Sequence, residues 1–191
     1  MSEHVVLFAG PMGSGKTTAI RSLSEIDVVS TEATNTDRET ADKETTTVAL
    51  DYGEITIDDV TKVRLYGVPG QKRFDFMWSI LAGRARGLLL LINNDAPDSV
   101  ALLLEYLNNF RDLHSRGAVV IGVTKSDVSD APSVADYSAA LTAASPDQLI
   151  PVFTVDPRNA EEMRTLLLTL VASVEMRELL APAPAPISEK I

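Results

Sequence analysis

The segment GPMGSGKT, residues 10–17, restricts the possible folds more than any other part of the sequence. It matches the pattern G-x-x-x-x-G-K-[S/T] at every fixed position, and it directly follows the short apolar run HVVLFA of residues 4–9. Apolar residues then recur at helical spacing from Ala19 to Ile26. A glycine-rich loop between a strand and a helix is the setting in which this pattern binds phosphate groups.

The chemistry of such a loop depends on its main chain. Glycines let successive N–H groups turn toward anionic oxygens, and the N-terminus of the next helix adds unpaired donors and the positive end of its dipole. Lys16 is predicted to bridge the β- and γ-phosphates, and the Thr17 hydroxyl to ligate Mg²⁺. The alternative is a turn that only joins strand to helix. The predicted nucleotide-binding residues here are Gly10, Met12, Gly13, Ser14, Gly15, Lys16, Thr17 and Thr18.

Strand-like and helix-like segments alternate along the rest of the chain. The runs LLLLI and AVVIGV are typical of strands buried on both faces, and residues 98–116 carry a helical apolar stripe. The segments TTVALDYGEITI and TKVRLYG predict a hairpin, whereas the polar residues 30–45 predict a long loop. We expect an α/β fold of the P-loop NTPase class, with a mostly parallel six-stranded sheet, one antiparallel hairpin strand and helices on both faces.

Composition limits the domain count and the classes of partner. The 191 residues predict one globular domain over residues 1–180, followed by a flexible Pro/Ala-rich tail over residues 181–191. The sequence has no cysteine, so disulfides and thiolate metal sites are excluded. A formal net charge of −10 disfavours nucleic acids and anionic membranes as general partners. No segment has the pattern of a targeting peptide or membrane anchor, and we expect a cytoplasmic protein.

The motif TKSD, residues 124–127, follows the buried run AVVIGV at the position where a doubly wound sheet presents loops to a ligand. The Asp127 carboxylate can accept both the N1–H and the exocyclic amine of guanine, whereas adenine has an acceptor at N1 and no amine beside it. The stem of Lys125 can lie along the flat face of the base, and Thr124 completes the predicted base-binding set. The alternative is a solvated loop at a strand end.

Four motifs, GPMGSGKT, TTVALDYG, VPGQKRF and TKSD, make the chain similar to the Ras-like small GTPases over about residues 4–180. Within that superfamily it resembles the prokaryotic MglA-like branch and its relatives encoded beside Roadblock/LC7 proteins, because PGQ lacks the usual preceding aspartate. The resemblance implies a GTP/GDP switch with Mg²⁺ as cofactor. It also implies Roadblock/LC7-type or other regulatory protein partners. We expect GTP hydrolysis to be slow without a partner, because fast turnover needs an arginine finger.

The resemblance also assigns roles around the expected γ-phosphate. Thr47 matches the threonine that ligates Mg²⁺ and touches the γ-phosphate, with Thr46 as the alternative because TTT leaves the register open. The N–H of Gly70 matches the group that holds the γ-phosphate, and Gln71 the glutamine that orients the attacking water. The loop VDPR, residues 155–158, replaces the usual SAK loop; its backbone remains a candidate contact to the base, but no side chain there is assigned a role.

Gly67 stands where relatives carry an aspartate that holds the water shell of Mg²⁺. Asp51 lies on the neighbouring strand of the predicted hairpin, four residues after Thr47, so the two side chains share one face of the sheet. We hypothesise that Asp51 supplies the missing charge, because an unpaired carboxylate in the apolar run VALDY would be costly. The alternative is an edge-strand aspartate that faces solvent.

Hydrolysis requires further positive charge on the transferring phosphoryl group, as an arginine finger supplies. The internal candidates are Arg38, in the polar loop, and Arg73, two residues after Gln71; the alternative is that both are solvated surface arginines. Two other functions are a nucleotide-bound scaffold that hydrolyses nothing, for which Gly67 is the argument, and a P-loop enzyme that uses ATP, which TKSD disfavours.

Overall fold

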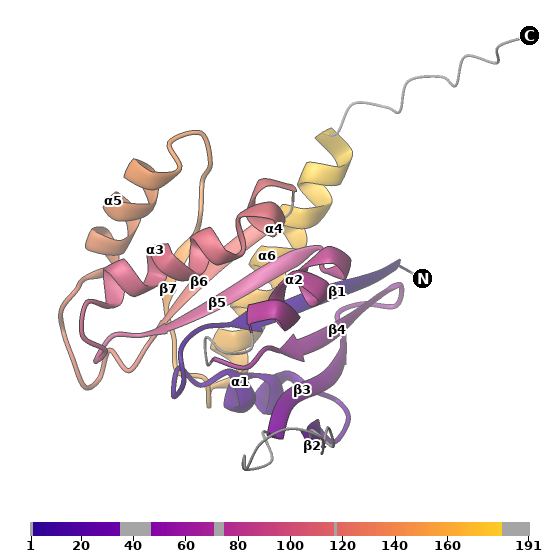
Figure 1. Cartoon of the computed structure of the whole chain (residues 1–191). Coiled ribbons are helices and arrows are strands. Elements are labelled where there is room, and N and C mark those ends of the chain that lie inside the picture. Colours follow the sequence, from indigo (N-terminus) through magenta and orange to yellow (C-terminus); the bar gives the residue numbers. More distant parts are fainter. Residues whose placement is uncertain (1, 35–46, 71–74, 117, 181–191) are drawn as a thin grey trace, which may run out of the picture.

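The computed structural model describes residues 2–34, 47–70, 75–116 and 118–180, which form a seven-stranded sheet flanked by helices (Figure 1). The strands are β1 (Ser2–Ala9), β2 (Val29–Thr34), β3 (Thr47–Thr56), β4 (Thr61–Gly67), β5 (Gly87–Asn93), β6 (Ala118–Thr124) and β7 (Val152–Thr154). The helices are α1 (Lys16–Leu23), α2 (Asp75–Arg84), α3 (Ser99–Asn109), α4 (Arg111–Arg116), α5 (Val134–Ala144) and α6 (Ala160–Leu180).

The sheet has the strand order β2-β3-β4-β1-β5-β6-β7, and β3 is antiparallel to both of its neighbours. The pairs β4–β1, β1–β5, β5–β6 and β6–β7 are all parallel. The predicted α/β class and the β3–β4 hairpin are therefore confirmed. Parallel strands joined by helical crossovers place helices on both faces of the sheet, as the alternating apolar runs indicated.

The predicted count of six strands is wrong, because the segment expected to be a loop over residues 30–45 begins as strand β2. This strand pairs with β3 along one edge only, from Val29 opposite Tyr52 to Thr34 opposite Thr47. An edge strand needs main-chain hydrogen bonds on one side and no apolar face, so its polar sequence carries little strand signal. The predicted helix over residues 98–116 is also divided, into α3 and α4, at Phe110.

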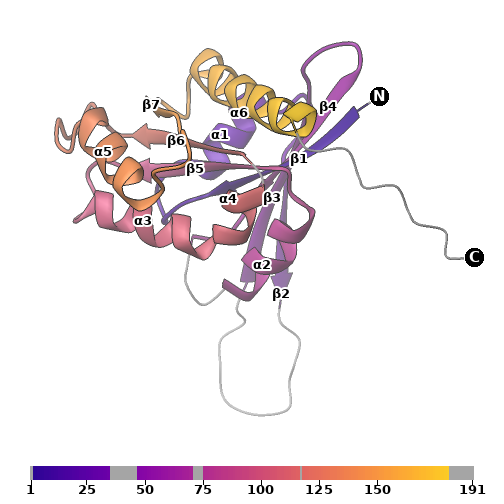
Figure 2. The ribbon, with the colours of Figure 1, turned by 90° about the horizontal axis from the view of Figure 1, so that it is seen from above.

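Helices cover the two faces of the sheet unequally. Seen from above, α1 and α6 lie on one side of the sheet, and α2, α3, α4 and α5 lie on the other (Figure 2). Alternate residues of the central strands enter the two resulting cores: Leu88, Leu90 and Ile92 of β5 pack toward α3, whereas Leu89 and Leu91 pack toward α6. All five are fully buried, as expected for a strand covered on both faces.

This arrangement brings several loops to one edge of the sheet. The loops that follow β1, β5, β6 and β7 all leave the carboxyl ends of parallel strands, and in such a sheet that edge is where ligands bind. Within the described residues, no helix combines the length and apolar character needed to cross a membrane.

Candidate nucleotide-binding site

The glycine-rich loop between β1 and α1 adopts a backbone conformation that residues with a side chain rarely adopt. Gly10, Gly13 and Gly15 have positive φ angles of 137°, 80° and 93°. A Cβ atom would lie 2.0 Å from the Leu91 carbonyl oxygen at Gly10, and 2.5 Å from Pro157 Cγ at Gly15. None of the described residues accepts a hydrogen bond from the N–H of Gly13 or Gly15. These donors are thus available to an anionic ligand.

Lys16 folds back over this loop. Its ammonium donates to the carbonyl oxygens of Gly10, at 2.9 Å, and Pro11, at 2.7 Å. Burial lowers the pKa of Lys16 to about 8, and the negative charge of Asp51 opposes part of that decrease. A phosphate group bound in the loop would favour the charged ammonium, so the pKa of Lys16 would rise on binding.

This difference in pKa predicts how affinity depends on pH. Below pH 8 the Lys16 ammonium is already charged, whereas above it the free protein must take up a proton to bind phosphate. We expect the affinity for a nucleoside diphosphate to be about tenfold lower at pH 9 than at pH 7. Titration calorimetry across this range measures the change. Lys16→Arg is the control, because its guanidinium stays charged and its profile should be flat; a flat wild-type profile would contradict the assignment.

A carboxylate occupies the position that Gly67 leaves open. Asp51 pairs with Gly67 across β3 and β4, and a Cβ atom on Gly67 would lie 3.3 Å from Asp51 Oδ2. Asp51 is 9% exposed. The Thr17 hydroxyl donates to Oδ2 at 2.5 Å, and the Ser30 hydroxyl of β2 donates to Oδ1 at 2.7 Å. The carboxylate therefore faces the start of α1 and is not the solvent-facing alternative.

The residues around Asp51 fit a magnesium ion bound together with phosphate. Mg²⁺ takes oxygen ligands and keeps several waters, so a hydroxyl and a carboxylate at the mouth of a phosphate loop form a suitable set. Thr17 is the hydroxyl, and Asp51 can act on the metal directly or through a bound water. Of Thr47 the structure describes only the main chain, at the first position of β3.

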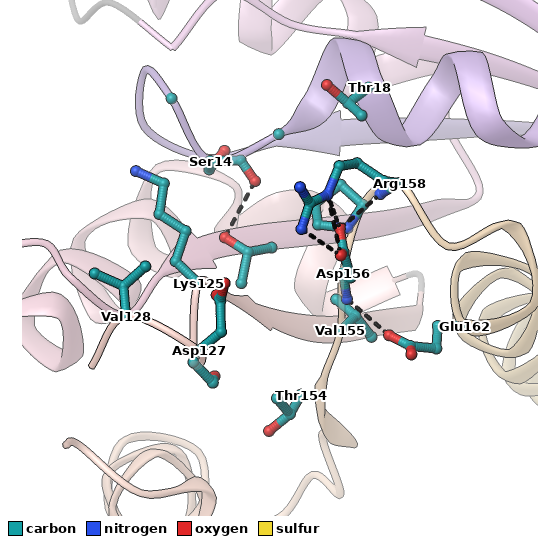
Figure 3. Close-up of a pocket in the computed structure, with 15 residues that line it drawn as sticks. Ser14, Thr18, Lys125, Asp127, Val128, Thr154, Val155, Asp156, Arg158 and Glu162 are labelled. Atoms are coloured by element: carbon teal, nitrogen blue, oxygen red, sulfur yellow. Dashed lines mark hydrogen bonds and ion pairs between the residues drawn. The ribbon is translucent and has the colours of Figure 1, made fainter. Parts of the chain in front are cut away.

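The other end of the site is a pocket of about 570 Å³ that reaches from the glycine-rich loop to the TKSD segment (Figure 3). The Thr124 hydroxyl, buried at the end of β6, donates to the Ser14 carbonyl oxygen at 3.3 Å and so ties the two loops together. Lys125 has a positive φ of 58°, and its ammonium lies 3.1 Å from Asp95 Oδ2. Asp127 lines the pocket, whose other predicted residues are Gly13, Ser14, Gly15, Thr18, Thr124 and Lys125.

The loop after β7 also lines this pocket and was assigned no side-chain role from sequence. Asp156 accepts three hydrogen bonds from the Arg158 guanidinium: from Nε to Oδ1 at 2.9 Å and to Oδ2 at 3.0 Å, and from Nη2 to Oδ2 at 2.7 Å. This contact lowers the pKa of Asp156 to about 2. Glu162, in the first turn of α6, accepts from the Asp156 N–H. The available signal was positional, because β7 ends at the ligand edge of the sheet.

The segment Pro69–Gly70 lies between the glycine-rich loop and α3. A Cβ atom on Gly70 would lie 2.7 Å from both the Gly10 carbonyl oxygen and the Met12 nitrogen, so only glycine fits this close approach. The Tyr106 hydroxyl donates to the Gly70 carbonyl oxygen at 2.8 Å, and Trp78 Nε1 donates to the Pro69 carbonyl oxygen at 3.0 Å. Burial raises the pKa of Tyr106 to about 12, so its hydroxyl remains a donor.

Several predicted residues lie outside the described part of the chain. These are Arg38, Thr46, Gln71 and Arg73, together with the tail over residues 181–191. Their assigned roles stay predictions.

Solved structures share this fold at low sequence identity. A Trypanosoma brucei structure described as the Arl6 BBS3 small GTPase with the bound nucleotide analogue GppNp aligns with a TM-score of 0.70 and 14% identity, over 92% of this chain and 99% of that one. A bacterial selenocysteine-specific elongation factor, EF-Sec, aligns with a TM-score of 0.62 and 20% identity, over 91% of this chain and 29% of that one. The chain thus has the small-GTPase fold.

Two sequence relatives match over parts of their length. Intraflagellar transport protein 22 of Chlamydomonas reinhardtii is 29% identical over 132 residues, which is 64% of each chain. An uncharacterized protein of Methanocaldococcus jannaschii is 58% identical over 31 residues, 16% of this chain and 20% of that protein. The chain therefore spans less than two thirds of either relative.

A protein-family profile covers most of the chain. It matches residues 26–179, which begin after the glycine-rich loop and include the TKSD segment and the loop after β7. On this match, the chain belongs to the family described as conserved hypothetical ATP-binding proteins.

Proposed function

We propose that the protein is a guanine-nucleotide switch that binds GTP and GDP with Mg²⁺, hydrolyses GTP slowly, and binds protein partners in a nucleotide-dependent way. The observation that supports this most directly is the pocket of about 570 Å³. At one end it has the N–H groups of Gly13 and Gly15, which no described residue accepts from, and the Asp127 carboxylate is part of its lining. The N–H groups of the loop can bind a triphosphate, and the carboxylate can recognise a guanine base.

The roles of the chain's own residues follow from their positions. The glycine-rich loop and Lys16 would hold the phosphates, and the Gly70 N–H would contact a γ-phosphate. The close approach of Gly70 to the loop supports this role. Thr17, Thr47 and Asp51 would hold Mg²⁺, which neutralises charge on the transferring phosphoryl group when bound. Gln71 would orient the attacking water, and Arg73 or Arg38 would add positive charge.

The simplest experiment identifies the nucleotide that the protein carries. The purified protein is denatured, and any released nucleotide is identified by chromatography, while calorimetry compares GDP with ADP. We expect GDP to be bound at least tenfold more tightly than ADP, since one mispaired base edge leaves buried polar groups without partners. Equal affinities would overturn the proposal. They would favour the second candidate, an ATP-using P-loop enzyme, which the description of the family as ATP-binding supports.

The finer assignment concerns branch and partner. The pairing of Asp51 with Gly67 supports placement in the prokaryotic MglA-like branch, which would bring a Roadblock/LC7-type partner. The proposal also takes residues 1–180 as the GTPase domain and the location as cytoplasmic. Single-turnover hydrolysis with and without a candidate Roadblock protein tests the partner assignment. A protein that hydrolyses nothing under both conditions would instead be a nucleotide-bound scaffold.

Asp51 allows a specific test of the magnesium assignment. We expect Asp51→Asn to reduce the Mg²⁺-dependent gain in nucleotide affinity about ten- to hundredfold, because the carboxamide carries no charge. The measurement is the ratio of dissociation constants in EDTA and in Mg²⁺, with the exposed Asp59→Asn as control. The double variant D51G/G67D should regain part of the ratio, since removing the Asp51 side chain relieves two of the three close contacts of a Cβ atom at position 67, and the third, with the end of the Ile20 side chain at 2.9 Å, requires only a small shift. An unchanged ratio in Asp51→Asn would reject the assignment.

Trp78, the single tryptophan of the sequence, allows the switch itself to be observed. Its ring packs against those of Tyr106 and Phe110, each at a centroid-to-centroid distance of 5.4 Å, and its Nε1 donates to the Pro69 carbonyl oxygen beside Gly70. If Gly70 moves with the γ-phosphate, the emission maximum of Trp78 should differ between the GDP and non-hydrolysable GTP-analogue complexes. Tyr106→Phe, which releases the Gly70 carbonyl, should reduce this difference, whereas Tyr52→Phe should not. Identical spectra in both complexes would show that Pro69–Gly70 does not respond to the nucleotide.

A further inference from the structure

Glu162 makes contacts that differ from those its sequence position predicts. Asn159 caps α6, accepting from the Glu161 N–H at 3.1 Å, and a glutamate three residues after such a cap usually accepts from the N–H of the cap itself. Here the carboxylate of Glu162 accepts from the Asp156 N–H at 2.7 Å and from the Asn159 side-chain amide at 2.8 Å. Glu162 therefore reaches back to a loop that lines the nucleotide pocket (Figure 3).

This contact uses the one main-chain N–H of the loop that can change its hydrogen-bond partner. The Val155 N–H donates to the Val123 carbonyl oxygen at 2.9 Å, which continues the pairing of β6 with β7. Pro157 has no N–H, and the Arg158 N–H is held in a local turn by Asp156 Oδ1 at 2.9 Å. Only the N–H of Asp156 is bonded to a side chain from another element, and a rotation of that side chain would release it.

The polar group at position 6 of a bound purine needs a hydrogen-bond partner in this part of the pocket. When a carboxylate such as Asp127 accepts from the N1–H and the 2-amino group of guanine, the next polar atom along the same edge of the base is the carbonyl oxygen O6. Binding loses free energy if this oxygen gives up its hydrogen bonds to water and gains no hydrogen-bond donor from the protein. Adenine carries an amine at the same position, which donates and therefore suits a carboxylate acceptor.

We propose that Glu162 competes with the six-carbonyl of guanine for the Asp156 N–H, and so sets how strongly the pocket prefers guanine over adenine. Guanine binding then requires the Glu162 carboxylate to give up this bond, whereas the adenine amine can donate directly to Glu162. Asp127 and Glu162 thus favour opposite bases, and the observed preference is the balance between them. The inference rests on the proposed nucleotide-binding function and identifies a specificity residue for it.

The test compares Glu162→Ala and Glu162→Gln with wild type. Dissociation constants are measured by calorimetry for GDP, ADP and 6-thio-GDP, which keeps the N1–H and two-amine of guanine but has a weakly accepting sulfur at the six-position. In Glu162→Ala the Asp156 N–H is free for O6, so GDP should bind about tenfold more tightly. ADP should bind more weakly, and 6-thio-GDP should gain less than threefold by the same reasoning. Glu162→Gln keeps an acceptor without charge and should show a smaller increase for GDP.

A role limited to supporting the loop would give a different result. Glu162→Ala would then weaken all three ligands in parallel, leave the GDP-to-ADP preference unchanged, and overturn the inference; thermal unfolding verifies that each variant is folded. Glu161→Ala, on the same turn of α6 but exposed, is the matched control and should change nothing. Failure of the proposed function is separate, because it would appear as equal affinity of the wild-type protein for GDP and ADP.

Discussion

Replacing Lys16 by methionine is expected to weaken GDP and GTP binding about a thousandfold, because the charged contacts to two phosphates contribute roughly 4 kcal/mol. Methionine keeps the length and apolar stem of the side chain. The variant should also be at least as stable as wild type, since it removes a buried ammonium whose pKa burial has already lowered to about 8. Calorimetry and thermal unfolding measure the two effects.

The control for this prediction is Lys62→Met, which removes a lysine of β4 that pairs with Glu54 away from the glycine-rich loop. It should leave nucleotide affinity unchanged. If Lys16→Met binds GDP within a few-fold of wild type, the hydrogen bonds from Lys16 to the Gly10 and Pro11 carbonyls are only a local loop contact, and the phosphate site must lie elsewhere.

Asp127→Asn is expected to change the base that the protein prefers from guanine to xanthine. Its carboxamide has one acceptor and one donor, so it cannot accept from both the N1–H and the amine of guanine, and GDP should bind about a hundredfold more weakly. Xanthosine diphosphate has a carbonyl in place of that amine, which the asparagine amide can donate to, and its affinity should rise. A competition assay with the two diphosphates measures the change.

Asp130→Asn is the matched control for this exchange, because Asp130 lies in the same loop after β6 and is exposed. It should leave the preference for guanine as it is in wild type. A similar loss of GDP, ADP and xanthosine diphosphate binding in Asp127→Asn would mean that Asp127 supports the loop and does not read the base, and the choice of guanine in the proposed function would fail.

Local sequence patterns were sufficient where one physical requirement acts within a short segment. The glycines of residues 10–15 are needed because the backbone turns through positive φ, and the continuous apolar runs within β5 and β6 are needed because both faces of these strands are covered. The α/β class and the β3–β4 hairpin were predictable for the same reason. Strand β2 was missed, because the main-chain bonds of an edge strand to β3 leave almost no mark on its side chains.

Contacts between distant segments could only be partly anticipated. The alternation of β3 led to the hypothesis that Asp51 replaces the carboxylate absent at Gly67, but the bonds of Asp51 to Thr17 and Ser30 depend on the register of three strands and on α1. The bond from the Asp156 N–H to Glu162 departed from the pattern that the helix start indicated. In both cases a side chain had a choice of partners, and sequence spacing alone does not select among them.

The sequence by itself determined the class of fold, the phosphate loop and the candidate base-reading aspartate, because each follows from residues adjacent in the chain. Only the tertiary structure decided which carboxylate lies beside Thr17 and which acceptor holds the loop after β7. Those outcomes depend on how the sheet edge brings separate loops within hydrogen-bond distance of one another.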